Sequence, residues 1–187
     1  MKKILLLFLF IITGCTNYTD LKNLSIIKSI GIDYDDSYTI YAQIYDEIKK
    51  DEIPKTKVIS AKANTLENAF KNLEREANKK IYFSHIDLLV LNTNLTYQYK
   101  DIISYFLNNN DFRNDYLCII SDNINDLLNN SNYDEIENTI KNNKQVLNIT
   151  FHNLINNYYN HNEFKISKIN YNKKIVFAGN NLIKRKD

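Results

Sequence analysis

The sequence contains three glycines, one proline and no tryptophan. Of these shortages, that of glycine excludes the largest number of binding motifs. Gly14, Gly31 and Gly179 lie far apart, so neither a phosphate-binding loop nor a dinucleotide-binding fingerprint can be written. Enzymes that hold nucleotides by those motifs are therefore excluded.

Residues that ligate metals or act as nucleophiles are also few. The histidines are His85, His152 and His161, which form no HExxH pair, and the two cysteines complete no zinc motif. The acidic run at residues 33–36 begins like a calcium loop, but the glycine and the glutamate that the loop needs do not follow. A hairpin turn is the better interpretation of this run. We therefore expect no enzyme activity, no metal and no cofactor.

The charges are balanced. The chain has 24 basic and 22 acidic residues, and Lys2 and Lys3 in the leader account for the whole excess. No basic surplus is left to neutralise phosphates, so we expect no nucleic-acid partner.

Residues 1–14 have the pattern of a bacterial lipoprotein signal peptide. Two lysines precede the apolar residues 4–12, a run about half as long as the ~20 residues that a membrane-spanning helix needs. The run ends in "TGC", which resembles a lipobox, and the alternative is an ordinary signal peptide with a chance cysteine. We expect lipidation of Cys15, a tether over residues 15–23, and attachment to the outer face of the cytoplasmic membrane.

The second cysteine, Cys118, has no intramolecular partner once Cys15 is modified. It lies within the apolar run "YLCIIS". This context favours a buried, unreactive thiol over a reactive nucleophile.

Alternation of apolar residues predicts strands at residues 24–33, 38–48 and 56–63, the first two joined by a turn at "YDDS". In the second strand one face should be buried, and in the third strand Val58 and Ala61 should be the apolar positions of a period-two pattern. The expected buried face comprises Tyr38, Ile40, Ala42 and Ile44.

A helix is predicted from residue 66 to about residue 77, capped by Asn64 or Thr65, with Asn64 and Glu67 spaced as in a capping box. A buried strand follows in "IDLLVLN". The next helix should carry Ile102, Ile103, Phe106 and Leu107 on one face.

The loop "NNNDFRND", a strand in "YLCIIS" and a helix at residues 124–128 complete this part. Antiparallel strands followed by strand-helix units predict an α+β fold, in which helices pack on a mixed sheet. Beyond residue 129 the pattern weakens, with a helix expected in "FHNLINNYY" and a strand and turn in "KIVFAGNNLIK". We expect one domain at residues 24–150, and a helix plus the truncated start of a second domain at residues 151–187.

Several segments, in order, resemble the C-subunit lipoproteins of spore-germination nutrient receptors, the Ger(x)C family. The sequence "GID" follows Cys15 at the family's spacing, the next strand resembles the family's second strand, and "YFSH" precedes a buried strand, as in the family. Departures are Thr16 and Asn17 in place of Trp-Asp, and an end about halfway along a usual member. The positions that carry the resemblance, with structural or interface roles, are Gly31, Asp33, Gln43, Tyr82, Phe83, His85 and Arg113. For His85, a hydrogen-bonded structural role and a ligand-contacting role both stay open.

The resemblance implies a non-enzymatic receptor component that is lipid-anchored at the extracytoplasmic face of the spore inner membrane. Its implied partners are the A- and B-type membrane subunits of the receptor. Two alternatives are a general envelope lipoprotein that binds a solute or a partner protein, and the product of a decayed gene.

Overall fold

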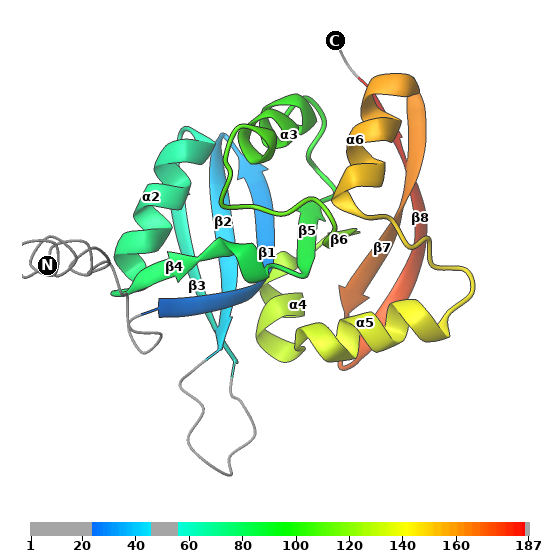
Figure 1. The fold of residues 1–187 in the computed structure, drawn as a ribbon. Helices are drawn as coiled ribbons and strands as arrows, with labels where there is room; N and C mark the ends of the chain where they lie inside the picture. The colour runs from blue at the N-terminus through cyan, green and yellow to red at the C-terminus, as the bar shows by residue number, and fades with distance from the viewer. Residues whose placement is uncertain (1–23, 46–55, 186–187) are drawn as a thin grey trace, which may run out of the picture.

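A computed structural model describes residues 24–45 and 56–185, which form a mixed eight-stranded β-sheet covered by α-helices (Figure 1). The predicted α+β class is confirmed. Cys15, the signal peptide and the tether lie outside the described residues. The strands are β1 (Leu24–Asp35), β2 (Ser37–Tyr45), β3 (Thr56–Ala63), β4 (Lys80–Tyr82), β5 (Leu88–Asn92), β6 (Leu117–Ser121), β7 (Glu163–Tyr171) and β8 (Ile175–Lys184). The helices are α2 (Leu66–Glu76), α3 (Tyr99–Leu107), α4 (Ile124–Asn130), α5 (Tyr133–Asn142) and α6 (Phe151–Asn160), with a 3₁₀ turn, η2 (Phe83–His85).

The strands are ordered β3-β2-β1-β5-β6-β7-β8, and β4 pairs with the first residues of β1. The central strands β1, β5, β6 and β7 are parallel, whereas β2, β3 and β8 add antiparallel edges. A tight turn at Asp36, with φ of 58°, joins β1 to β2 as the acidic run predicted. The parallel neighbours β5 and β6 are instead joined through α3, because parallel strands require a crossover connection.

Helices cover both faces of the sheet, so there are two hydrophobic cores. Residues of α2, α3 and α6 pack on one face, and residues of α4 and α5 pack on the other. Strand β5 serves both cores, with Leu89 and Leu91 on the first side and Leu88 and Val90 on the second. This double burial explains why its sequence is continuously apolar rather than alternating.

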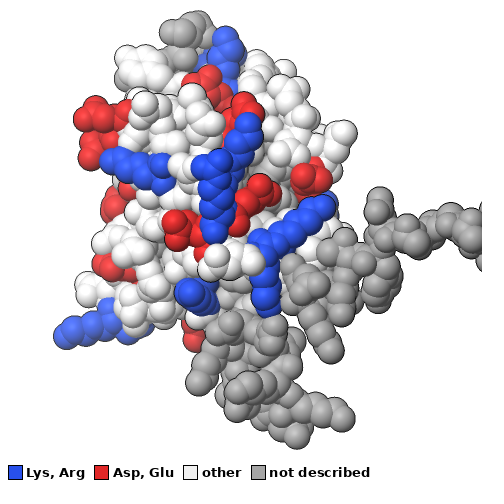
Figure 2. Space-filling view, turned by 90° about the vertical axis from the view of Figure 1, so that its left-hand side faces the viewer, with Lys and Arg blue, Asp and Glu red and all other residues white. Residues whose placement is uncertain are grey.

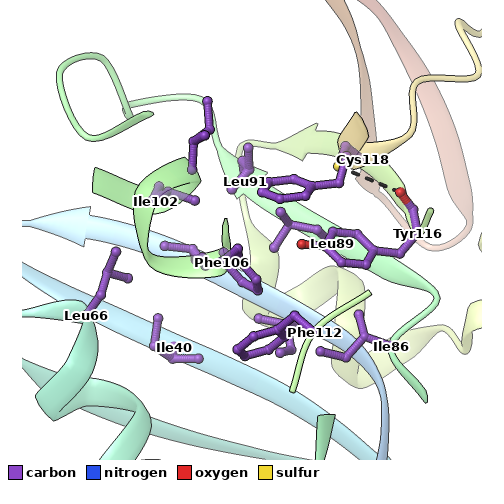
Figure 3. Close-up of a cluster of buried hydrophobic side chains, with 14 of the residues drawn as sticks. Ile40, Leu66, Ile86, Leu89, Leu91, Ile102, Phe106, Phe112, Tyr116 and Cys118 are labelled. Carbon is purple, nitrogen blue, oxygen red and sulfur yellow. Dashed lines mark hydrogen bonds between the residues drawn. The ribbon is translucent and has the colours of Figure 1, made fainter. Parts of the chain in front are cut away.

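The larger core is centred on aromatic rings. Phe106 of α3 lies 4.5 Å from Phe112 and 5.4 Å from Phe151, measured between ring centroids. Figure 3 shows Phe106 and Phe112 among aliphatic side chains of the sheet. Phe70 of α2 stacks on Tyr105 at 4.8 Å, which joins α2 to α3. Rings from separate elements therefore hold this layer of helices together.

The first half of the chain follows the predicted elements closely, except that the short strand β4 was not predicted, and three corrections apply. Leu107 is 45 % exposed, and Tyr99 takes the place on the buried face of α3 that Leu107 was expected to share. Of the two predicted caps, Thr65 is the one that caps α2. The second correction is that Glu67 pairs with Lys71 at 2.6 Å instead of closing a capping box.

The third correction concerns β3, where Val58 and Ala61 contact opposite cores. Residues three apart in a strand point to opposite faces. Ile59 and Ala63 are the residues that share a face with Ala61.

Two elements after residue 129 were missed. Helix α5 has a complete capping box between Asn132 and Glu135, and this spacing is readable in the sequence. Strand β7 alternates Phe164 and Ile166 with polar residues, but its register shifts after Ser167, which obscures the pattern. The boundary at residue 150 stays a prediction about domains, while the sheet continues across it because β7 pairs with β6.

Two neighbouring residues of α3 give a matched test of the aromatic core. Phe106→Ala should lower the free energy of unfolding by about 3–5 kcal/mol, because it opens a cavity among the aromatic rings that surround it. Leu107→Ala should change it by less than about 0.5 kcal/mol, because the side chain is largely in solvent. Urea denaturation followed by circular dichroism measures both, and equal losses would contradict the assigned faces of α3.

Candidate functional site

Gly31 of β1 lies directly beneath α4, and the helix leaves no room there for a side chain. A Cβ atom at this position would lie 2.2 Å from Cγ2 of Ile124 and 3.3 Å from Cδ1 of Leu128. Such contacts are too short, so α4 would have to move away from the sheet. Close packing of α4 on β1 therefore explains why glycine, and no larger residue, occupies this position of the resemblance.

Gln43 of β2 holds the other end of the same helix. Its side chain is fully buried, and its Nε2 donates to the carbonyl oxygens of Leu128 at 2.7 Å and Ser131 at 2.6 Å. Its Oε1 accepts from the Ser29 hydroxyl at 3.2 Å. The last carbonyls of a helix lack partners within the helix, so Gln43 supplies from the sheet the donors that α4 needs.

Asp33 lies near the end of β1 on the same face as Gly31. Its carboxylate accepts a hydrogen bond from the backbone N–H of Tyr34 at 2.7 Å. Burial, followed by the negative charge of Asp33, raises the pKa of the Tyr41 hydroxyl. Asp33 thus belongs to the local structure of the hairpin.

Tyr82, Phe83 and His85 face different environments although they lie side by side in the chain. Phe83 is buried and packs 4.9 Å from Phe112, between ring centroids. Tyr82 is 40 % exposed, and its ring lies 5.1 Å from the ring of His85, which is also exposed. The structure favours neither a buried structural histidine nor an enclosed ligand site at position 85.

Arg113 lies in the loop between α3 and β6, exposed to solvent. Its guanidinium pairs with both carboxylate oxygens of Asp115, with Nε at 2.9 Å from Oδ1. The Arg113 guanidinium holds the pKa of the Asp115 carboxyl below its ordinary value. Ser84 Oγ donates to the carbonyl of Asp111 at 3.0 Å, so this loop is tied to the segment that carries His85.

A groove of about 940 Å³ runs between α2 and α3 and was not foreseen from the sequence. Its floor includes the stacked rings of Phe70 and Tyr105. Its charged residues are mostly acidic, and the one lysine among them, Lys71, is paired with Glu67. The lining carboxylates are those of Glu67, Glu74, Asp101 and Asp111. Its chemistry suits a cation better than an anion.

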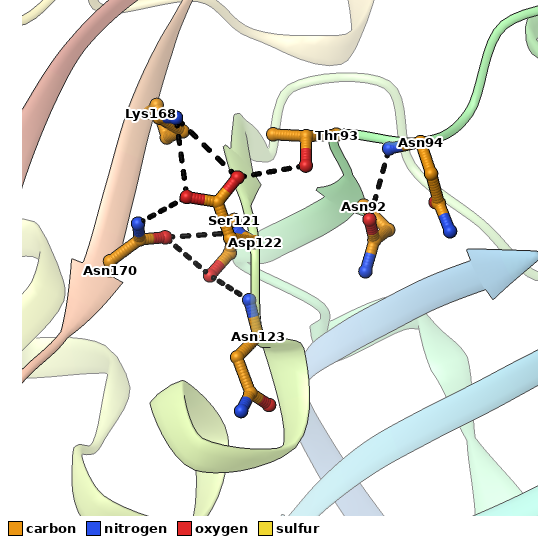
Figure 4. A network of polar contacts seen from close by, with 8 residues as sticks. All are labelled: Asn92, Thr93, Asn94, Ser121, Asp122, Asn123, Lys168 and Asn170. Carbon is orange, nitrogen blue, oxygen red and sulfur yellow. Dashed lines mark hydrogen bonds and ion pairs between the residues drawn. The ribbon is translucent and has the colours of Figure 1, made fainter.

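A polar cluster joins the carboxyl ends of β5, β6 and β7 (Figure 4). The carboxylate of Asp122 accepts from Thr93 Oγ1 at 2.9 Å and from Asn170 Nδ2 at 2.6 Å, and it pairs with Lys168 at 3.2 Å. These contacts, led by the Asn170 hydrogen bond, lower the pKa of Asp122. Because these side chains occupy the carboxylate oxygens of Asp122, the cluster holds the ends of the three strands together. We call it the Asp122 clamp.

Cys118 is buried in the larger core, as expected. Burial raises the pKa of its thiol well above the ordinary value, so the reactive thiolate is strongly disfavoured. Within the described ranges, no group of three or more histidine, cysteine or acidic residues could hold a metal ion. Among the helices described, none is long and apolar enough to cross a membrane.

Comparison with known proteins gives two matches. The family model of the spore germination protein N-terminal domain matches residues 17–171. Spore germination protein KC of Bacillus subtilis (strain 168) is 27 % identical over 103 residues, which cover 49 % of this chain and 25 % of that protein. The match thus spans about a quarter of the length of this curated relative. No solved structure matches the chain.

Replacing Gln43 tests whether it holds α4. Gln43→Leu should lower the free energy of unfolding by about 2–6 kcal/mol, since two buried carbonyls each lose a partner at about 1–3 kcal/mol. Ser29→Ala is the control, because it removes only the 3.2 Å bond and should cost about 1 kcal/mol. A loss for Gln43→Leu no larger than the control in urea denaturation would show that α4 does not depend on this side chain.

The Asp122 clamp predicts a dependence of stability on pH. A carboxyl whose folded pKa is lowered stabilises the fold above its unfolded pKa of about 3.9, and this stabilisation is lost as the pH falls through the folded pKa. The wild type should therefore exceed Asp122→Asn in stability at pH 7, and the difference should shrink below pH ~4. Urea midpoints measured between pH 7 and pH 3 test this, and a constant difference would contradict it.

Proposed function

Because the chain belongs to the family of the spore germination protein N-terminal domain, we propose that it acts as a non-catalytic subunit of a spore-germination receptor. The observation that carries this proposal is the family match, which covers residues 17–171 and thus the sheet from β1 through β7. The relative in Bacillus subtilis is itself named a spore germination protein.

We propose further that a lipid on Cys15 anchors the chain on the extracytoplasmic face of the spore inner membrane. The basic start, the short apolar run and the "TGC" motif support this. The family match begins at residue 17, two residues after Cys15, as expected if the folded part follows the modified cysteine closely. A chain held at the membrane has a high effective concentration beside embedded partners, so weak contacts suffice for assembly.

The proposed partners are the A- and B-type membrane subunits of the receptor. Six of the seven resemblance positions fall into two groups that fit such a role, and Asp33 is half-buried. Gly31, Gln43 and Phe83 are buried and build the fold, whereas Tyr82, His85 and Arg113 are exposed. Exposed side chains that the fold does not require are available for contact.

The groove between α2 and α3 favours a second candidate, an envelope lipoprotein that binds a cationic solute. Its volume of about 940 Å³ and its four carboxylates support this reading. Neighbouring genes for a permease and an ATPase, rather than for receptor subunits, would favour the second candidate over the first.

Deleting the gene in the organism that encodes it tests the receptor role. The deletion strain should lose germination with a nutrient while it keeps germination by routes that bypass receptors, and the wild-type gene should restore it. The tagged chain should also co-purify with A- and B-type subunits from spore membranes. Normal nutrient germination of the deletion strain, with no paralogue present, would contradict the proposal.

Substituting the two cysteines separates anchoring from folding. Cys15→Ala should abolish incorporation of labelled palmitate and release the chain from membranes, because one thiol is the acceptor. Cys118→Ala is the matched control and should keep the label, since that thiol is buried in the core. Label retained in Cys15→Ala would show that the anchor is elsewhere.

A further inference from the structure

The exposed residues of β4 lie beside the point where the described chain begins. Leu24 pairs with Lys80, and Ile26 pairs with Tyr82. Any tether that ends at Leu24 therefore enters the fold next to these two side chains. Among the strands that the structure describes, β4 pairs with β1 alone.

The side chains at this place share an amphipathic character. Tyr82 is 40 % exposed and contacts the exposed ring of His85, and Lys80 is exposed beside it on β4. Lys57 is exposed at the same end of the sheet on β3, which β2 and β1 separate from β4. We call these four residues the β4 edge. Tyrosine and lysine combine an apolar body with a polar tip, and such side chains suit the boundary between water and lipid headgroups.

Covalent geometry keeps the β4 edge near the proposed anchor. Leu24 is nine positions after Cys15 in the sequence, so the two cannot lie more than about 32 Å apart. The opposite end of the sheet is farther away, because the 12 residues of β1 extend over about 36 Å. Tyr97 marks that opposite end, in the loop where Asn94 donates to the carbonyl of Tyr34.

The charges at this end are partly compensated within the fold. Asp87 pairs with Lys28, and Asp115 pairs with Arg113, so these carboxylates are neutralised locally. Seen from the side where β3, α2 and β4 lie, the surface carries both basic side chains and carboxylates (Figure 2). Glu76, exposed at the end of α2, adds a negative charge near this end, so we assign the main contact to Tyr82 and a smaller one to the lysines.

We propose that the β4 edge lies against the headgroups of the bilayer, with Tyr82 at the lipid-water boundary and Lys57 and Lys80 attracting anionic phospholipids. This inference rests on the proposed lipid anchor at Cys15. The anchor and the β4 edge together then determine which end of the sheet faces the membrane. The end that carries Tyr97 and the Asp122 clamp then faces away from the bilayer.

The sequence offers a direct reporter, since it contains no tryptophan. Tyr82→Trp and Tyr97→Trp each introduce a single tryptophan, which can be excited selectively over the tyrosines, at opposite ends of the sheet and at exposed positions. The full lipidated chain is reconstituted in phosphatidylcholine–phosphatidylglycerol vesicles in which part of the phosphatidylcholine carries a headgroup nitroxide. Such a quencher acts only at short range, so we expect several-fold stronger quenching at position 82 than at position 97.

A charge reversal tests the contribution of the lysines. Lys80→Glu in the Tyr82→Trp chain should weaken quenching in vesicles that contain phosphatidylglycerol, and should have less effect in phosphatidylcholine alone. Lys100→Glu is the matched control, because Lys100 is exposed at the start of α3, at the far end of the sheet. Equal effects of the two reversals would overturn the assigned role of the lysines.

Vesicle flotation separates failure of this inference from failure of the proposed function. A lipidated chain that does not float with vesicles refutes the anchor itself. A chain that floats but shows equal quenching at positions 82 and 97 keeps the anchor and refutes the orientation. If position 82 is unquenched by lipid but crosslinks to a membrane subunit, the β4 edge is a protein-binding surface and the lipid proposal is wrong.

Discussion

The contact of α4 with the sheet is the constraint on which the second face of this fold depends. The helix is held at its start by Asn123, whose side chain accepts from the backbone of Asp126, and at its end by the amide of Gln43. Between the two ends, Gly31 lets the helix approach β1 so closely that a methyl group would collide with Ile124. The Asn123 cap is a local contact, the Gln43 hydrogen bonds are long-range, and the effect of Gly31 is steric. Together they set the position of α4, and through the short connection at Ser131 they set the start of α5.

The same arrangement separates the resemblance positions by role. Those that face a core are explained by packing or by hydrogen bonds that the backbone requires. Tyr82, His85 and Arg113 contribute little to either core, yet they lie at the amino-terminal ends of the central parallel strands. Their common location follows from the topology, because β4, the start of β5 and the start of β6 all meet at that end of the sheet. A surface built in this way fits contact with a membrane or its proteins better than enclosure of a substrate.

Much of the fold up to α4 was predictable because each element carries its own pattern. Strand β5 is uniformly apolar since both of its faces are buried, and α2 repeats its apolar residues at helical spacing. Helix α5 was missed although its capping box is readable, and β7 was missed because a shift in register interrupts its alternation. The groove between α2 and α3 could not be predicted, since its walls come from segments far apart in the chain.

The sequence by itself determined the class of the fold, the family resemblance and the expectation of a lipid on Cys15. These properties depend on local periodicity or on short motifs, which are complete in the linear chain. The tertiary structure decided which of the motif residues are buried and which are exposed, and which cluster together. Gln43 donates to Leu128, 85 residues further along the chain, and Tyr82 pairs with Ile26. Neither contact can be predicted from the residues that neighbour these positions in the sequence. Such contacts arise only when the strands are placed in the sheet, because sheet order is set by long-range packing and not by neighbouring residues.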